Sequence, residues 1–133
     1  MNQRHTLSPR LFVVEPDNDV RPSLKTNLQN WGYDVIMALD EADAIQRSQG
    51  VHQQFGLILL NQYKQPIEAT LAIGQRIREN TKPARDVPIL ILAEQYGDDL
   101  EGQNVPIGDH EYVLYLEDAE QLKVMLQRLC PVA

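Results

Sequence analysis

An uninterrupted aliphatic run, residues 57–60 between Gly56 and Asn61, limits the folds that this chain can adopt. A strand with one wet face alternates apolar and polar residues, whereas a continuous aliphatic run indicates a strand that is covered on both faces. Strands of that kind belong to parallel sheets with helices on either side. Ligands and chemistry in such folds lie at the carboxyl ends of the strands, which is where Asn61 is predicted to lie.

Segments typical of strands and of helices alternate along the rest of the chain. Runs of aliphatic, β-branched and aromatic residues predict four more strands, at residues 11–14, 33–39, 87–92 and 112–116. Apolar residues at helical spacing predict four helices that begin near Asp19, Asp40, Pro66 and Asp118. The three aspartates are candidate helix caps. Three glycines and a proline interrupt residues 93–110, so the fourth helix of the series is expected to be short or irregular.

Right-handed crossovers turn this alternation into an α/β three-layer sandwich. The pattern predicts a flavodoxin-like fold, with a five-stranded parallel sheet in the order 2-1-3-4-5. The 133 residues suffice for one domain. We predict a flexible tail over residues 1–9, a single domain over residues 10–130 and a short carboxyl-terminal end over residues 131–133. A fold of this kind does not specify a function.

Composition excludes several classes of function. Nineteen acidic residues against twelve basic ones give a net charge of −7, which opposes nucleic-acid binding. No apolar run is long enough to span a membrane and the first residues lack the apolar core of a signal peptide, so we expect a cytoplasmic protein. The single Cys130 excludes an internal disulfide. Residues 15–19 lack the glycines of a phosphate-cradling loop, so no nucleotide, flavin or other cofactor is expected.

The sequence resembles the receiver domain of two-component response regulators, the CheY-like family, from about Arg10 to Leu129. Four segments carry the resemblance: residues 11–21, 31–35, 56–61 and 87–93. The resemblance implies a site in which an acidic pair after the first strand holds Mg²⁺ and an aspartate after the third strand accepts a phosphoryl group. It also implies a Ser or Thr after the fourth strand and a Lys-Pro pair after the fifth, which read the phosphorylated state.

The positions that the resemblance assigns to metal and phosphate differ from that pattern. Glu15 matches the first acid, Pro16 stands at the second, and Asp17 is a displaced substitute. Asn61 stands at the phosphoacceptor position. A carboxamide is not a competent nucleophile and gives no charge to a cation, so we expect no phosphorylation of Asn61. Glu15 and Asp17 are the weak candidates for a metal site, and solvated acids near a helix start are the alternative interpretation.

The positions that would read a phosphoryl group also differ. Ala93 falls where the hydroxyl residue belongs, and Tyr115 followed by Leu116 falls where the Lys-Pro pair belongs. Neither Ala93 nor Tyr115 supplies the hydrogen bond or the cation of the family. Pro66 comes one residue later than the family's proline, so residues 62–65 should form a remodelled loop.

One segment carries charge of a single sign. Residues 86–122 contain no Lys or Arg and ten acidic residues. The resemblance implies that partners dock on the face made by the fourth helix, the fifth strand and the last helix, so an acidic docking face for a basic partner protein is expected. Its candidate residues are Asp98, Asp99, Glu101, Glu111, Tyr112 and Glu117. A solvated acidic loop that serves solubility is the alternative.

These observations predict a pseudo-receiver, a phosphorylation-independent protein-interaction module in signalling that is not an enzyme. Degenerate receivers occur in cyanobacterial clock and light-response proteins, and this chain is similar in kind. The chain ends at Ala133 without an output domain, so it is expected to act by docking on another protein, and the sequence leaves its oligomeric state, a dimer included, open. The alternatives are a response regulator that still responds to phosphate or Mg²⁺ in a phosphorelay, and an enzyme or small-molecule binder at the strand ends.

Overall fold

The computed structural model describes residues 8–50, 54–81, 86–94, 96–97 and 99–132. Strands and helices follow one another as β1 (Arg10–Val14), α1 (Arg21–Asn30), β2 (Asp34–Ala38), α2 (Glu41–Gly50), β3 (Leu57–Asn61), α3 (Ile67–Asn80), β4 (Ile89–Leu92), β5 (Asn104–Pro106), β6 (Glu111–Leu114) and α4 (Ala119–Leu129). Most of the predicted tail, residues 1–7, lies outside the described residues. Within the described part of the chain, no helix is long and apolar enough to cross a membrane.

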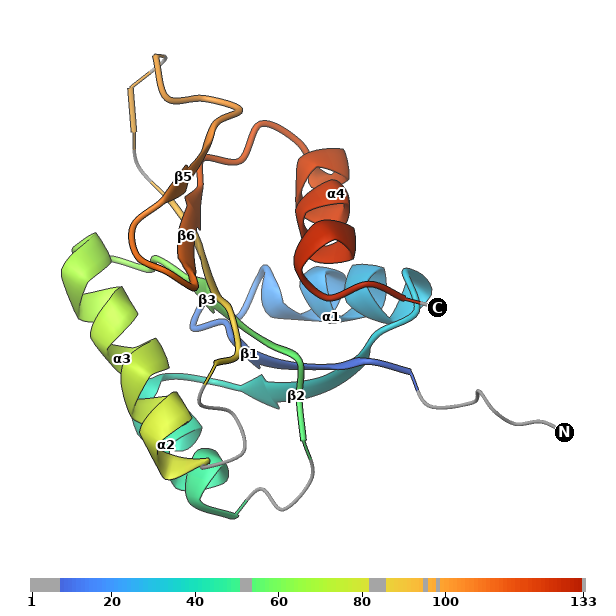
Figure 1. The fold of residues 1–133 in the computed structure, drawn as a ribbon, viewed down its shortest axis with the longest axis vertical. Coiled ribbons are helices and arrows are strands. Elements are labelled where there is room, and N and C mark those ends of the chain that lie inside the picture. The colour runs from blue at the N-terminus through green and yellow to red at the C-terminus, as the bar shows by residue number, and fades with distance from the viewer. Residues whose placement is uncertain (1–7, 51–53, 82–85, 95, 98, 133) are drawn as a thin grey trace, which may run out of the picture.

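The sheet has six strands in the order β2-β1-β3-β4-β6-β5 (Figure 1). Its first five members pair in parallel, which confirms the predicted α/β flavodoxin-like fold and the order 2-1-3-4-5 with β6 as the fifth strand. The prediction of five strands was wrong by one, because β5 pairs with β6 in antiparallel orientation at the sheet edge. β5 is only three residues long and ends in Pro106, so it carries little of the pattern by which a strand is recognised.

The segment before β5 agrees with the prediction of a short or irregular fourth helix. Its described residues form turns and no helix between β4 and β5. Gly102 has a φ of 83° and donates its N–H to the Tyr115 carbonyl at 2.7 Å, while the Gln121 side chain donates to the Gly102 carbonyl at 2.6 Å. These bonds tie the segment to β6 and α4.

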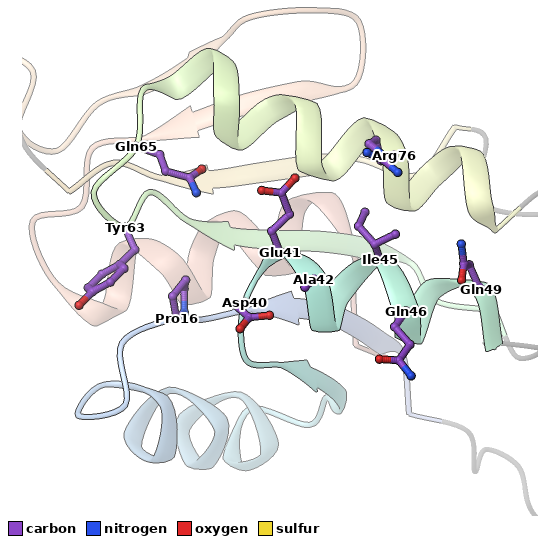
Figure 2. Close-up of a pocket in the computed structure, with 10 residues that line it drawn as sticks. All are labelled: Pro16, Asp40, Glu41, Ala42, Ile45, Gln46, Gln49, Tyr63, Gln65 and Arg76. Atoms are coloured by element: carbon purple, nitrogen blue, oxygen red, sulfur yellow. The ribbon is translucent and has the colours of Figure 1, made fainter.

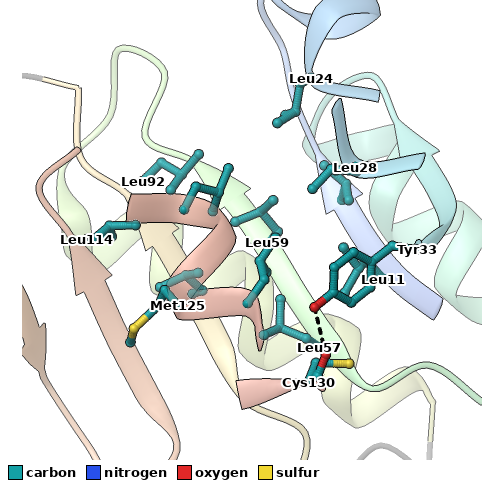
Figure 3. Close-up of a cluster of buried hydrophobic side chains, with 14 residues drawn as sticks. Leu11, Leu24, Leu28, Tyr33, Leu57, Leu59, Leu92, Leu114, Met125 and Cys130 are labelled. Carbon is teal, nitrogen blue, oxygen red and sulfur yellow. Dashed lines mark hydrogen bonds between the residues drawn. The ribbon is translucent and has the colours of Figure 1, made fainter. Parts of the chain in front are cut away.

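Two hydrophobic layers cover the sheet, and successive strand residues enter alternate layers. Leu57 and Leu59 of β3 pack with α1 and α4, together with Tyr33 and Cys130 (Figure 3). Residues Ile58 and Leu60 of β3 pack on the other face with α2 and α3. Burial of each such aliphatic side chain contributes about 1.5–3 kcal/mol, so the covered strand predicted at residues 57–60 is the centre of the fold.

Helix starts show which predicted caps operate. Asp118 accepts the Gln121 N–H at 3.1 Å in a capping box, and Asp40 accepts the Asp43 N–H at 2.8 Å. The prediction for Asp19 was wrong, because α1 starts after Val20 without a side-chain cap. The Asp19 N–H instead donates to Asp17 Oδ1 at 2.9 Å, so the Asp17 side chain forms an Asx turn with the backbone two residues later.

Cys130 is buried, and burial raises the pKa of its thiol. The hydroxyl group of Tyr33 donates to the Cys130 carbonyl at 2.7 Å (Figure 3). Burial raises the pKa of Tyr33 to about 12, with the neighbouring Cys130 as the second cause. This bond fixes the end of α4 against the start of β2.

Candidate functional site

The carboxyl ends of β1 and β3 bring Glu15 and Asn61 into direct contact. The Asn61 side-chain nitrogen donates to Glu15 Oε1 at 2.9 Å and to Oε2 at 2.8 Å. Neighbouring parallel strands place the two residues side by side although they are 46 positions apart in the sequence. Because the amide is oriented with its donor toward the carboxylate, Asn61 and Glu15 form one paired unit, which we call the cleft pair.

Burial is the largest influence on the pKa of Glu15. Glu15 has no exposed surface, and burial raises the pKa of its carboxyl group. The hydrogen bond from Asn61 and one from the Asp17 backbone N–H, at 3.2 Å, act in the opposite direction by stabilising the charged form. Glu15 is the only buried acidic residue among the described residues. Its carboxyl group, held by N–H donors, is therefore part of the packed structure.

Arg21 supplies a cation beside the cleft pair. Its Nε donates to the Glu15 carbonyl at 2.8 Å and its Nη2 to the Pro16 carbonyl at 3.2 Å. The first turn of α1 thereby closes the loop that contains Asp17. In the sequence, Arg21 stood out only as the last residue of a segment that matches the receiver pattern. The available signal was an arginine at the start of the helix that follows an acidic loop.

The cleft does not offer what a divalent cation requires. Mg²⁺ takes octahedral oxygen coordination with carboxylates as its charged partners. Here the Glu15 oxygens accept N–H groups, Pro16 has no side-chain ligand, and the donor atom that Asn61 directs at Glu15 is a nitrogen. Within the described residues no group of three His, Cys, Asp or Glu side chains is arranged to hold a metal ion. These residues therefore do not fit a Mg²⁺ site.

The two positions named as degenerate switch residues lie in an apolar environment. Ala93 is buried at the end of β4 and donates its N–H to the Leu114 carbonyl at 3.0 Å. Tyr115 packs edge-on against Tyr96, with ring centroids 5.4 Å apart, and the Tyr96 hydroxyl donates to the Leu116 carbonyl. The Tyr115 side chain thus serves in packing, and it contacts Tyr96 in the segment before β5.

The loop after β3 has its own hydrogen bonds. Lys64 has a φ of 58°, a left-handed conformation that is uncommon outside glycine. The Gln62 side chain donates to the Gln65 carbonyl at 2.8 Å and accepts the Glu94 N–H at 2.9 Å. The Lys64 amino group lies 5.0 Å from the centre of the Tyr63 ring. These contacts connect the ends of β3 and β4 through side chains.

The predicted acidic partner face does not form one surface. Asp99, Glu101 and Glu117 are exposed, whereas Asp98 lies outside the described residues. Glu111 is mostly buried and pairs with Arg78 at 2.6 Å, so it fastens β6 to α3. Tyr112, the next residue on the strand, packs into the opposite layer with α1 and α4. The structure therefore separates Glu111 and Tyr112, because successive strand residues point to opposite faces.

Solved structures with the same fold include three from signalling proteins of bacteria. The chemotaxis protein CheY4 of Vibrio cholerae has a TM-score of 0.68 and 22% identity over 92% of this chain and 99% of its own. The receiver domain of a Pseudomonas aeruginosa sensor histidine kinase, with a magnesium ion in its active-site cleft, has a TM-score of 0.64 and 21% identity over 92% and 98%. The response regulator TrrA of Thermotoga maritima, in complex with Mg²⁺ and BeF, has a TM-score of 0.64 and 23% identity over 91% and 98%.

These likenesses define the class of fold. The structural neighbours are response regulator receiver domains, and the chain has the CheY-like receiver fold over almost its whole length. No protein-family model matches the sequence, and no curated protein matches it either. The identities lie below 25%, so the likeness concerns the fold, and the chemistry of the cleft has to be argued from the residues themselves.

Proposed function

We propose that this protein is a pseudo-receiver, a signalling module with the receiver fold that binds partner proteins without being phosphorylated. The observation that carries the proposal is the cleft pair, in which the Asn61 amide donates to both oxygens of Glu15 at 2.8 and 2.9 Å. A phosphoacceptor must offer a nucleophilic oxygen at this strand end. The Asn61 nitrogen is bound to Glu15 instead, so both oxygens of the neighbouring acid are occupied as hydrogen-bond acceptors.

The remaining residues of the cleft support the same proposal. Arg21 binds the carbonyl groups of the loop after β1, and Ala93 has no hydroxyl group with which to contact a phosphoryl oxygen. Tyr115 packs on Tyr96 and carries no cation. A phosphoryl group at this strand end would lie against the buried Glu15 carboxyl group, and the neighbouring Arg21 guanidinium already donates to backbone carbonyl groups.

The partner proposed for this module is a protein with a basic docking surface. Three exposed acids, Asp99, Glu101 and Glu117, lie around the segment before β5 and the start of α4, a region that we call the acidic edge. Lys and Arg are absent from residues 86–122, so opposite charge on a partner would be steered to this edge. The protein would act in the cytoplasm and need no cofactor.

The test is incubation with acetyl phosphate and Mg²⁺ followed by intact-mass measurement. The wild-type protein is expected to gain no phosphoryl group, and the Asn61→Asp variant serves as the matched control. Labelling of the variant alone would identify Asn61 as the residue that blocks transfer, and labelling of neither would show that the whole cleft is unable to accept phosphate. A labelled wild-type protein would refute the proposal and favour a response regulator that uses Asp17 or another acid.

A further inference from the structure

A groove of about 670 Å³ runs between α2 and α3 and opens at the carboxyl edge of the sheet (Figure 2). Glu41, Ile45 and Gln49 are spaced four residues apart and therefore share one face of α2. Figure 2 shows Glu41 and Ile45 directed toward α3, from which Arg76 lines the other side. We call this feature the α2–α3 groove.

The groove begins beside the cleft pair. Pro16 and Tyr63 line its open end, and they follow Glu15 by one residue and Asn61 by two. Both belong to loops in which the chain departs from the receiver pattern. An occupant of the groove would therefore touch the backbone that holds the cleft pair.

A hydrogen bond far from the open end fixes the two helices. Asn80, the last residue of α3, donates its side-chain N–H to the Ser48 hydroxyl of α2 at 2.9 Å. Ser48 is buried and in turn donates to the Ile45 carbonyl at 2.7 Å. The spacing of the helices is thus set by specific contacts, and the groove is a preformed part of the fold.

Charges of opposite sign lie at different places along the groove. Asp40 and Glu41 are exposed acids near the open end, and the guanidinium of Arg76 is exposed on α3 (Figure 2). Within the described residues the side chains of Glu41 and Arg76 make no hydrogen bond and no ion pair. Both are therefore available to an external partner.

The lining around these charges suits an extended polypeptide. The side chains of Gln46, Gln49 and Gln65 line the groove, and each amide offers two donors and an acceptor that match peptide N–H and C=O groups. Ile45 is half-buried and supplies an apolar contact between them. Compact sites for small ligands are mostly apolar and enclosed, whereas this groove is open and carries polar side chains beside its apolar surface.

We propose that the α2–α3 groove binds an extended segment of a partner protein that carries a basic side chain at the Asp40 and Glu41 end, an apolar side chain over Ile45 and an acidic side chain at Arg76. Charge complementarity and the amide-rich lining carry this proposal. The groove is separate from the acidic edge, and the proposal stands whether or not the protein is phosphorylated.

The test uses an immobilised library of random hexapeptides, probed with the purified full chain. Peptides retained by the wild type are expected to share a basic and an acidic residue on either side of an apolar one. Glu41→Gln and Arg76→Gln should each weaken a retained peptide about two- to fivefold, the range of exposed ion pairs. The double charge exchange Glu41→Arg with Arg76→Glu should select peptides in which the order of the basic and acidic residues is reversed.

Circular dichroism checks that each variant is folded, and Lys25→Gln, at an exposed position of α1 on the opposite face of the sheet, serves as the control that should leave peptide binding unchanged. The proposal is overturned if the wild type retains no peptide above background, if retained peptides show no charge preference, or if Lys25→Gln weakens them as much as Glu41→Gln does.

Discussion

The cleft pair and the acidic edge use the same kind of side chain in opposite surroundings. Glu15 is fully buried and accepts N–H groups from Asn61 and Asp17, whereas Asp99, Glu101 and Glu117 are exposed. A buried acid is tolerated only because donors inside the protein replace water. An exposed acid keeps its hydration and can attract a distant partner. Glu15 therefore contributes to the stability of the fold, whereas the three acids of the acidic edge are available for contact with a partner.

Asn61→Asp should lower the free energy of unfolding more than any other change considered. It replaces an N–H donor with a second carboxylate against buried Glu15, and two carboxylates in one site strongly raise one of their pKa values. At pH 7 the free energy of unfolding should fall by about 2–4 kcal/mol, since each unit of pKa shift corresponds to about 1.4 kcal/mol. Urea denaturation measures the loss.

The same variant should regain stability as the pH is lowered, because the two carboxyl groups can then share a proton. Asn61→Ala removes the donor without adding charge and serves as the control, with a smaller loss expected. Equal stability of Asn61→Asp and wild type at pH 7 would mean that Glu15 does not depend on its partner.

Arg21→Met should have the next largest effect. The change removes the hydrogen bonds to the Glu15 and Pro16 carbonyl groups, which are 2.8 and 3.2 Å long. Because Arg21 is partly exposed, a loss of about 1–2 kcal/mol in the free energy of unfolding is expected. Lys25→Met, at an exposed position of the same helix, should change it by less than about 0.5 kcal/mol. Similar losses in both variants would contradict a specific role for Arg21.

Glu15→Gln tests the pKa of the buried acid. Burial raises the pKa of Glu15 above its ordinary value of 4.5, so the folded state binds the proton more tightly than the unfolded state does. The contribution of Glu15 to stability is then fully present below about pH 4.5 and is lost as the pH rises through the folded-state pKa. The stability of wild type relative to Glu15→Gln should therefore fall as the pH rises above about 4.5 in urea titrations.

The stability of wild type relative to Asp43→Asn should change with pH in the opposite direction to its stability relative to Glu15→Gln. The Leu39 N–H, and after it Arg47, lowers the pKa of Asp43 below its ordinary value of 3.8. Its contribution is present above that value and lost as the pH falls. A wild-type advantage over Glu15→Gln that grows with pH would show that the pKa of Glu15 is lowered rather than raised.

Neutralising the acidic edge should have the smallest effect on stability. The triple variant Asp99→Asn, Glu101→Gln and Glu117→Gln changes exposed side chains only, so the free energy of unfolding should stay within about 0.5 kcal/mol of wild type. Binding of octalysine, followed by fluorescence anisotropy at low salt, should weaken in this variant and become less dependent on salt. Neutralising Glu68 and Glu79, two exposed acids on α3, should weaken it less. A large loss of stability in the triple variant would mean that the exposed acids of the acidic edge stabilise the fold as Glu15 does.

Sequence patterns predicted the parts of this molecule that depend on hydrophobic periodicity and local capping. The strand at Leu57–Asn61 and the Asp118 cap follow from residues close together in the chain, and the parallel order follows from the alternation of strands and helices. The Asn61 contact with Glu15 could not be predicted, because it depends on the orientation of two side chains from different strands. The burial of Glu111 could have been anticipated, since it shares a strand face with Val113 two residues later.

The antiparallel strand β5 has a consequence for how the sheet ends. Gln103 and Ile107 bond inward to β6, so Asn104 and Pro106 direct their backbone groups outward. Proline has no N–H, which leaves the Asn104 N–H as the one outward donor within β5. A foreign strand approaching this side would find too few partners to continue the ladder, so β5 terminates the sheet and protects it from edge-to-edge aggregation.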